Sequence, residues 1–253
     1  VVVTTPTGLQ ASSTIYVVSG TLAFVQDGVV RTRAPGGGDV AERGGTGAAS
    51  APAWSPDGTR LFFAEGGSVR LTGDGAPLFA GGWPSVSPNG TKLAADDGAS
   101  VVFANDDGSN ATAGPSGTTP VWSGDAELIV GGGSVQRVSA DGSGRSDVAG
   151  GSAELPALGP GGAVAYVDGG ALMVAGGGTV ATGVDGRPSW SPNGLWLVVQ
   201  SSGGLVLAPV DGSAAPAALP GLEGASDPAF QPSGVLSAPP ALSLAGVDPD
   251  PPI

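Results

Sequence analysis

Residues 51–60 read APAWSPDGTR, in which a tryptophan lies between two prolines and Asp-Gly follows the second proline. Related heptads recur along the chain at intervals of 32, 36, 36, 32 and 40 residues. The six copies are PAWSPDG from Pro52, PSVSPNG from Pro84, PVWSGDA from Pro120, PALGPGG from Pro156, PSWSPNG from Pro188 and PAFQPSG from Pro228. Such periodicity is the signature of a repeat architecture in which each copy is one supersecondary unit.

Short apolar runs follow each copy of the heptad. In the first copy LFFA begins at Leu61 and SVRL at Ser68, and in the fifth LWLVV begins at Leu195 and LVLAPV at Leu205. Runs of this length, rich in Val and Leu and bounded by turn residues, predict β-strands. No stretch sustains the 3.6-residue period of an amphipathic helix. We therefore expect an all-β protein.

The turn that follows each tryptophan or its replacement has a physical basis in its residue types. In Ser55-Pro56-Asp57-Gly58 the proline presets φ at the second turn position, Asp suits the third, and Gly takes the left-handed geometry. The corresponding turn residues of two other copies are Pro88, Asn89 and Gly90, and Pro192, Asn193 and Gly194. These residues predict a tight hairpin in every copy, and we interpret them as structural anchors.

One bulky apolar residue lies at a fixed place in each copy, between its two proline positions. These residues are Trp54, Val86, Trp122, Leu158, Trp190 and Phe230. A large side chain at one place per repeat is what stacking of neighbouring sheets requires. Four short antiparallel strands per repeat of about 40 residues are typical of β-propeller blades.

The pattern P-x-W-S-P-D-G, followed by two apolar strands and Asp-Gly, resembles the TolB-like propeller repeat over about residues 20–234. The resemblance is strong at Pro52, Pro84 and Pro188. It is weaker at Pro120, where Gly124 replaces the second proline, and at Pro156. It implies that the motif forms the inner strand and first hairpin of a blade. It also implies a periplasmic or cell-surface protein that offers its disc face or channel to partners.

The number of blades follows from how the ends of the chain are used. Residues 21–42 supply three strands without a first strand, and residues 227–234 supply a first strand without successors. Joining them completes one shared blade, gives six blades and protects the sheet edges. A count of seven remains the alternative, with residues 13–20 as a first strand and both ends of the chain completing the additional sheet.

The same reasoning gives domain bounds. We expect an N-terminal extension at residues 1–13, a single propeller domain at 14–245, and a Pro-rich tail or linker at 246–253.

The composition excludes several kinds of chemistry. The chain of 253 residues has 22 carboxylates against 9 Lys or Arg, a formal net charge of −13, which disfavours nucleic acid as a partner. It has no Cys and no His, so thiolate nucleophiles, imidazole bases and His-ligated zinc are excluded. No apolar run approaches the ~20 residues of a membrane span. We expect no catalytic residues and no required cofactor.

Carboxylates are the remaining candidates for a site. Asp106, Asp107 and Asn110 offer oxygen ligands within five residues of sequence, the type that calcium prefers. The twelve-residue calcium-loop pattern is absent, and Asp-Asp-Gly is also ordinary turn composition, so the cluster predicts a turn with calcium as the alternative. Trp83 is expected in the core, and Arg31 and Arg33 are expected on a solvated sheet face.

Three functions remain open. The favoured one is a non-enzymatic scaffold at the cell surface or in the periplasm that binds a protein partner or assembles with copies of itself. The alternative is a module that binds a carbohydrate or small ligand, with calcium assisting; the third is a carboxylate-dependent lyase or hydrolase. A channel lined by Ala, Val and Ser would favour the scaffold, and a ring of inward Asp, Asn and Arg with an ordered ion would favour ligand binding.

Overall fold

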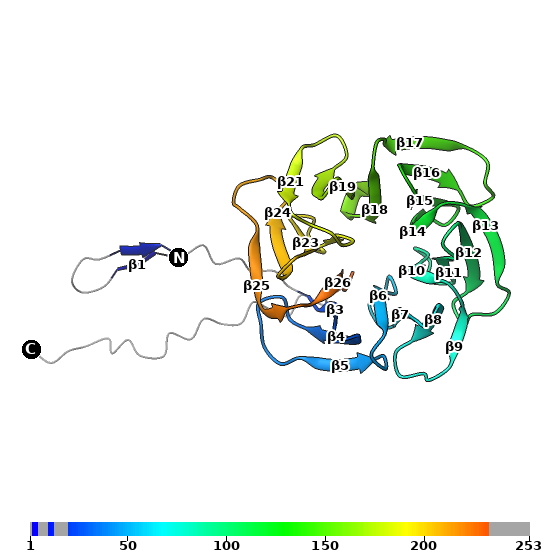
Figure 1. The fold of residues 1–253 in the computed structure, drawn as a ribbon, viewed down its shortest axis with the longest axis horizontal. Helices are drawn as coiled ribbons and strands as arrows, with labels where there is room; N and C mark the ends of the chain where they lie inside the picture. Colours follow the sequence, from blue (N-terminus) through cyan, green and yellow to red (C-terminus); the bar gives the residue numbers. More distant parts are fainter. Residues whose placement is uncertain (1, 5–9, 13–19, 233–253) are drawn as a thin grey trace, which may run out of the picture.

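The computed structural model describes residues 2–4, 10–12 and 20–232. Within these ranges six four-stranded antiparallel sheets form a closed ring around an axis (Figure 1). The prediction of an all-β propeller with six blades is confirmed, and the alternative of seven blades is wrong. The strands β1 (Val2–Thr4) and β2 (Gln10–Ser12) pair with each other in a separate two-stranded sheet and complete no blade.

The strands of each blade are numbered below from the axis outward. Blade 1 consists of β26 (Ser226–Phe230), β3 (Leu22–Gln26), β4 (Val29–Arg33) and β5 (Ala41–Gly44). Blade 2 consists of β6 (Ala49–Trp54), β7 (Leu61–Glu65), β8 (Ser68–Leu71) and β9 (Pro77–Ala80). Blade 3 consists of β10 (Gly82–Val86), β11 (Lys92–Asp96), β12 (Ser100–Asn105) and β13 (Thr112–Ser116).

The other half of the ring repeats this order. Blade 4 consists of β14 (Thr118–Gly124), β15 (Glu127–Gly131), β16 (Val135–Ser139) and β17 (Arg145–Ala149). Blade 5 consists of β18 (Ala153–Leu158), β19 (Val164–Asp168), β20 (Ala171–Val174) and β21 (Thr179–Thr182), with a short 3-10 helix η1 (Pro160–Gly162) in its first hairpin. Blade 6 consists of β22 (Ser189–Trp190), β23 (Trp196–Ser201), β24 (Gly204–Pro209) and β25 (Ala217–Glu223).

Blade 1 closes the ring with strands from both ends of the described chain. Ser226 lies opposite Val25 and Phe230 opposite Leu22 in the pairing of β26 with β3. The predicted shared blade is therefore confirmed. The described propeller runs to Pro232, so the predicted tail at 246–253 lies outside the described residues, and the predicted domain bounds stay predictions.

The hydrophobic core lies between neighbouring blades, because the second strand of each sheet is covered on both faces. All five residues of β7 are buried. Leu61 and Phe63 of this strand pack in one cluster with Ala23 and Val25 of blade 1. Burial on both faces explains why the second strands read as continuous apolar runs without polar alternation. Each blade is thus stabilised mainly by its two neighbours.

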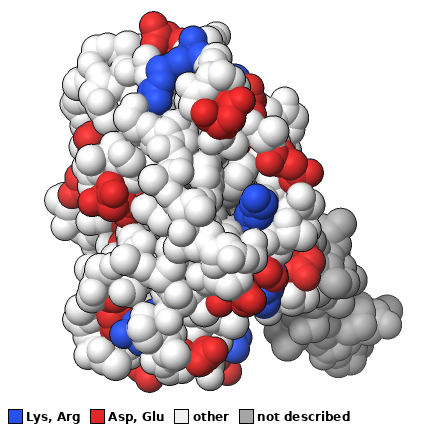
Figure 2. All heavy atoms as spheres, turned by 90° about the vertical axis from the view of Figure 1, so that its right-hand side faces the viewer, with Lys and Arg blue, Asp and Glu red and all other residues white. Residues whose placement is uncertain are grey.

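The surface is unevenly charged. The rim shown in Figure 2, which is the right-hand side of Figure 1, carries acidic and basic side chains among larger neutral areas. Residues 22–147 contain 14 Asp or Glu and 8 Lys or Arg. Residues 148–222 contain only 4 Asp or Glu and 1 Arg. In the described part of the chain, no helix is long and apolar enough to cross a membrane.

Arg33 departs from the expectation for blade 1. Arg33 is 7% exposed, so it does not lie on a solvated sheet face. The outer part of blade 6 approaches it, since Glu223 acts on its charge and a Cβ at Gly221 would lie 3.3 Å from its Nη1 atom. Arg31 remains partly exposed and pairs with Asp27 and Glu42.

Candidate functional site

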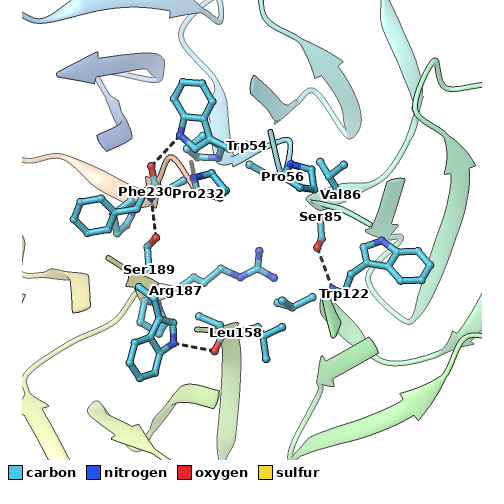
Figure 3. Close-up of a pocket in the computed structure, with 18 of the residues that line it drawn as sticks. Trp54, Pro56, Ser85, Val86, Trp122, Leu158, Arg187, Ser189, Phe230 and Pro232 are labelled. Carbon is cyan, nitrogen blue, oxygen red and sulfur yellow. Dashed lines mark hydrogen bonds between the residues drawn. The ribbon is translucent and has the colours of Figure 1, made fainter. Parts of the chain in front are cut away.

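A cavity of about 430 Å³ opens on the axis at the end where the first hairpins lie (Figure 3). We call this cavity the funnel. It is lined mainly by the repeated motif itself. The prolines that line it are Pro52, Pro56, Pro84, Pro88, Pro156, Pro160, Pro188, Pro192, Pro228 and Pro232. Trp54, Trp122 and Trp190 lie among them. Proline has no backbone N–H and a fixed φ, so these residues give the funnel a rigid, largely apolar wall.

A bulge in the inner strand precedes the first proline in five blades. The residue before that proline has left-handed backbone geometry at Ala51 (φ 47°), Trp83 (49°), Thr119 (47°), Leu155 (52°) and Asp227 (48°). The register of the inner strand shifts at each of these places. A bulge of this kind redirects side chains at the rim of a sheet. In blade 6 the equivalent residue is Arg187, and the inner strand begins only after Pro188.

Small side chains follow the first proline and connect neighbouring blades. The Oγ atom of Ser85 accepts a hydrogen bond from the Trp122 N–H at 3.2 Å, and that of Ser189 accepts one from the Phe230 N–H at 2.9 Å. The indole N–H of Trp54 donates to the Ala229 carbonyl at 3.1 Å, and that of Trp190 donates to the Ala157 carbonyl at 3.2 Å (Figure 3). The tryptophans thus lie between blades.

Arg187 extends from blade 6 into the centre of the ring, as Figure 3 shows. Its guanidinium lies over the ring of Trp83 in the opposite blade, 5.1 Å from the ring centroid, which is a cation–π distance. Its Nη2 atom donates to the Pro120 carbonyl of blade 4 at 3.2 Å. Trp83, expected in the core, therefore lies at the axis and is only partly buried.

The charge of Arg187 is partly desolvated, because the residue is half-buried. Burial lowers its pKa to about 10, while the carboxylates of Asp96 and Asp227 act in the opposite direction. Its Nε atom is buried and has no hydrogen-bond partner. Since the pKa stays well above neutrality, the guanidinium is a cation with unused donors at the floor of the funnel.

The two carboxylates near Arg187 are occupied by backbone groups of neighbouring blades. Asp96 accepts from the Thr119 N–H at 2.5 Å, and Asp227 accepts from the Ala51 N–H at 3.1 Å. Burial raises the pKa of Asp227, and the Ala51 N–H and Arg187 lower it. Asp227 therefore ties the inner strands of blades 1 and 2 together, and Asp96 ties the second strand of blade 3 to the inner strand of blade 4.

The candidate calcium ligands lie in the turn between β12 and β13, away from the funnel. Asp106 forms an ion pair with Arg60 of blade 2 at 2.8 Å. Asp107 accepts from the Ser109 N–H at 2.8 Å, and its hydrogen bonds to Ser109 lower its pKa. Asn110 is exposed with φ 55°. Over the described residues no three His, Cys, Asp or Glu side chains gather as a metal site. These residues form a turn, as predicted, and calcium at this turn stays the untested alternative.

The predicted anchors of the hairpins occupy the rim of the funnel. Gly58, Gly90 and Gly194 have φ of 70°, 74° and 72°, the left-handed geometry that their turns require. Asp57, Asn89 and Asn193 all accept hydrogen bonds from the serine two residues earlier. These serines, Ser55, Ser87 and Ser191, are almost fully buried, and the sequence reasoning did not single them out.

Arg187 was also missed, although a signal for it exists in the sequence. The six residues that precede the first prolines are Ala51, Trp83, Thr119, Leu155, Arg187 and Asp227. Inner-strand residues of a propeller line the axis, so charged residues in this column are candidates for a site. Alignment of the repeats by column, rather than a search for clusters along the chain, would have identified Arg187.

The funnel is suited to binding rather than to proton transfer. Among the described residues that line it, Arg187 alone is charged, and the others are mostly Pro, Ala, Val, Ser and Trp. General acid–base catalysis needs a group that gains and loses a proton near the working pH, and an arginine with a pKa of about 10 is poorly suited to this. The wall can contact apolar groups, and Arg187 can donate to an oxygen acceptor.

Solved structures of known proteins share this architecture. TolB from Acinetobacter baumannii superposes with a TM-score of 0.69 at 17% identity, over 85% of this chain and 67% of the other. The fold is that of the TolB propeller. A putative TolB from Agrobacterium tumefaciens gives a TM-score of 0.59 at 15% identity, over 84% of this chain and 92% of the other. The resemblance noted in the sequence is thereby confirmed for the fold.

A chain of a nidogen–laminin complex is also similar, with a TM-score of 0.64 at 12% identity over 84% of this chain and 98% of the other. No protein-family model matches the sequence, and no curated protein matches it. At such identities the similarity to TolB and to the other propeller establishes the fold alone.

Proposed function

We propose that this propeller is a non-enzymatic scaffold that binds a partner protein by accepting a segment of its chain in the funnel. The observation that carries the proposal is the pairing of an apolar wall of prolines and tryptophans with one partly desolvated cation at its floor. Rigid aromatic and proline surfaces bind with little loss of side-chain entropy. The resemblance to TolB-like repeats supports a periplasmic or cell-surface setting.

The segment that fits has an apolar side chain and an oxygen acceptor. The apolar group would contact the walls at Pro88, Pro160 and Trp54, and a carboxylate or carbonyl would accept from Arg187. A cation in a water-poor site favours a charged acceptor over a neutral one, since hydrogen bonds between ions are the stronger ones. The partner is therefore expected to offer an acidic residue or a chain terminus within an apolar stretch.

Photo-crosslinking in the native cells tests this site. A benzoylphenylalanine is placed at Pro88 or at Pro160, which lie on different blades of the rim, and in a control at Ser143, an exposed residue in the turn between β16 and β17. We expect both funnel positions to capture the same segment of one protein, identified by mass spectrometry, and the control to capture none of it. Capture from Ser143 alone would refute the proposal.

The variant Arg187→Met tests the role of the cation. Hydrogen bonds to charged groups contribute about 1.5–3 kcal/mol. We therefore expect the yield of crosslinked partner to fall about tenfold or more in this variant. Arg187→Lys, which retains the charge, should restore part of it. Thermal unfolding of both variants shows whether the ring is intact. Unchanged capture by a folded Arg187→Met protein would exclude Arg187 from the site.

A further inference from the structure

The chain leaves the described ring at the funnel itself. Pro232 is one of the prolines that line the funnel, and Figure 3 shows it beside Trp54. Residues 233–253 follow it in sequence and lie outside the described residues. They read SGVLSAPPALSLAGVDPDPPI. A stretch of suitable chemistry in this sequence is therefore tethered directly to the wall of the candidate site.

One such stretch has the chemistry that the funnel requires. Residues 248–252 read DPDPP, and we call them the acidic proline segment. Its second aspartate, Asp250, is the one acidic residue of the whole sequence that lies between two prolines. Asp248 and Asp250 carry the only charged side chains among residues 233–253. The segment thus offers carboxylates to the cation of the funnel and proline rings to its wall.

The prolines also favour a conformation that presents a carboxylate between apolar side chains. Proline and the residue before it favour polyproline II, in which every third side chain shares a face. In that geometry Val247, Asp250 and Ile253 share one face. Proline-rich segments bind aromatic-lined grooves at a low cost in conformational entropy, because their extended shape is already favoured before binding.

The segment brings few N–H groups into the funnel. The prolines and tryptophans of the wall have no acceptor in their side chains, and a buried N–H without an acceptor costs free energy. Three of the five residues of the acidic proline segment are prolines, which have no N–H. Its carboxylates need a donor instead, and the Nε atom of Arg187 is buried without a partner. The two surfaces are therefore complementary in hydrogen bonding.

The connection to the acidic proline segment is long enough to turn back into the funnel. Fifteen residues, 233–247, separate Pro232 from Asp248. A flexible chain of this length spans about 20 Å on average and about 50 Å when fully extended. Pro232 and Arg187 line the same cavity. A segment on such a tether has an effective concentration on the order of mM, so a weak affinity is enough to fill the site.

We propose that the acidic proline segment occupies the funnel of its own chain, with Asp250 accepting hydrogen bonds from Arg187. The segment is then an internal competitor that the partner protein must displace. This inference rests on the proposed function for the nature of the site and adds its regulation. The apparent affinity for the partner is reduced in proportion to the fraction of funnels that remain open.

Photo-crosslinking of the purified full chain tests the occupant. A benzoylphenylalanine is placed at Pro88, at Pro160 or, as the control, at Ser143, and the protein is irradiated without any partner. We expect mass spectrometry to find both funnel positions linked to a peptide that contains residues 248–252, and the control linked to no such peptide. A mixture of isotopically heavy and light chains separates a link within one chain from a link between two. Links between chains, or no link to this segment, overturn the proposal.

Two variants of the segment test its chemistry. The first is Asp250→Asn, which removes the charge of the acceptor, and the second replaces the three prolines of the segment by alanine, which adds three N–H groups. We expect the yield of the internal link from position 160 to fall several-fold in both. The matched control changes Pro239 and Pro240 to alanine, the same kind of change within the connection, and should retain the yield. Equal yields in all these proteins overturn the proposal.

Capture in the native cells separates this proposal from the proposed function. We expect the alanine variant of the segment to raise the yield of crosslinked partner at Pro88 and Pro160, because the competitor is lost. An unchanged yield overturns the competition. A partner that is captured while the purified protein shows no internal link overturns the internal occupant and leaves the proposed function. An internal link with no partner captured does the reverse.

Discussion

The first hairpins of blades 2 and 4 derive from the same repeat but are held together differently. In blade 2 six residues, 55–60, connect Trp54 with its cross-strand partner Leu61, and they include the turn Ser55-Pro56-Asp57-Gly58. In blade 4 only five residues, 123–127, connect Trp122 with Leu128, and they include Ser123-Gly124-Asp125-Ala126. The shorter connection removes the position at which a left-handed glycine closes the turn, and neither Asp125 nor Ala126 has a positive φ.

The hydrogen bonds of the two turns differ accordingly. In blade 2 the Ser55 hydroxyl donates to Asp57 at 2.5 Å and accepts from the Arg60 N–H at 2.9 Å, so the turn is closed by its own side chains. In blade 4 the Ser123 hydroxyl donates to Glu127 at 2.8 Å. Asp125 instead accepts from the Asn89 N–H of blade 3 at 3.2 Å. The intact motif stabilises its own turn, whereas the degraded copy depends on its surroundings.

The largest effect is expected where the intact turn loses its serine. Ser55→Ala removes a hydroxyl that is 1% exposed and leaves the Arg60 N–H without that acceptor. An unsatisfied buried group costs about 1–3 kcal/mol, and we expect a loss of this size in the free energy of unfolding, measured with urea. Ser123→Ala should cost about 0.5 kcal/mol or less, because Glu127 keeps its partner Arg137 at 2.7 Å.

Equal losses for the two serine variants would contradict the distinction between the turns. Ser87→Ala and Ser191→Ala extend the comparison, since both serines occupy the position of Ser55 and accept the same backbone hydrogen bond. They should behave like Ser55→Ala.

The two tryptophans provide the next test. Trp54→Phe removes the donor to the Ala229 carbonyl, whereas Trp122→Phe removes an indole N–H that is buried without a partner. We expect Trp54→Phe to cost about 1–2 kcal/mol and Trp122→Phe less, although Trp122 is the more buried of the two. Urea unfolding of both variants measures the difference. A larger loss at Trp122 would mean that ring volume outweighs the hydrogen bond.

The fold was predictable because each repeat carries the turn and strand signals of one whole blade in its own sequence. The period of 32–40 residues, the Pro-Asp-Gly turns and the apolar runs all agree on four strands per blade. The shared blade was predictable from the first strand at residues 227–234, which lacks successors. Agreement between local turn chemistry and global patterning is what makes such a prediction reliable.

The site was less predictable because its residues come from equivalent positions in different repeats rather than from one continuous stretch of sequence. Arg187, Trp83 and the Pro120 carbonyl lie in three different repeats and meet only because the ring closes. The burial of Arg33 likewise depends on the neighbouring blade. The clusters that are visible along the chain, such as Asp106 and Asp107, stay in turns, because residues adjacent in sequence share a loop rather than a channel.

The smallest effect is the pH dependence of the blade 2 turn. Hydrogen bonds from Ser55 and Thr59 lower the pKa of the exposed Asp57 to about 2, against about 3.9 in an unfolded chain. A lowered pKa contributes stability above about pH 3.9 that is lost as the pH falls through about 2. Asn occupies the same position at Asn89, so Asp57→Asn should be nearly neutral at pH 7 and should lose less stability than the unmodified protein below pH 4. The reciprocal variant Asn89→Asp should acquire the dependence. Urea unfolding between about pH 4 and pH 2 measures both, and parallel curves for the unmodified protein and Asp57→Asn would show that the hydrogen bonds of this turn do not depend on the charge of Asp57.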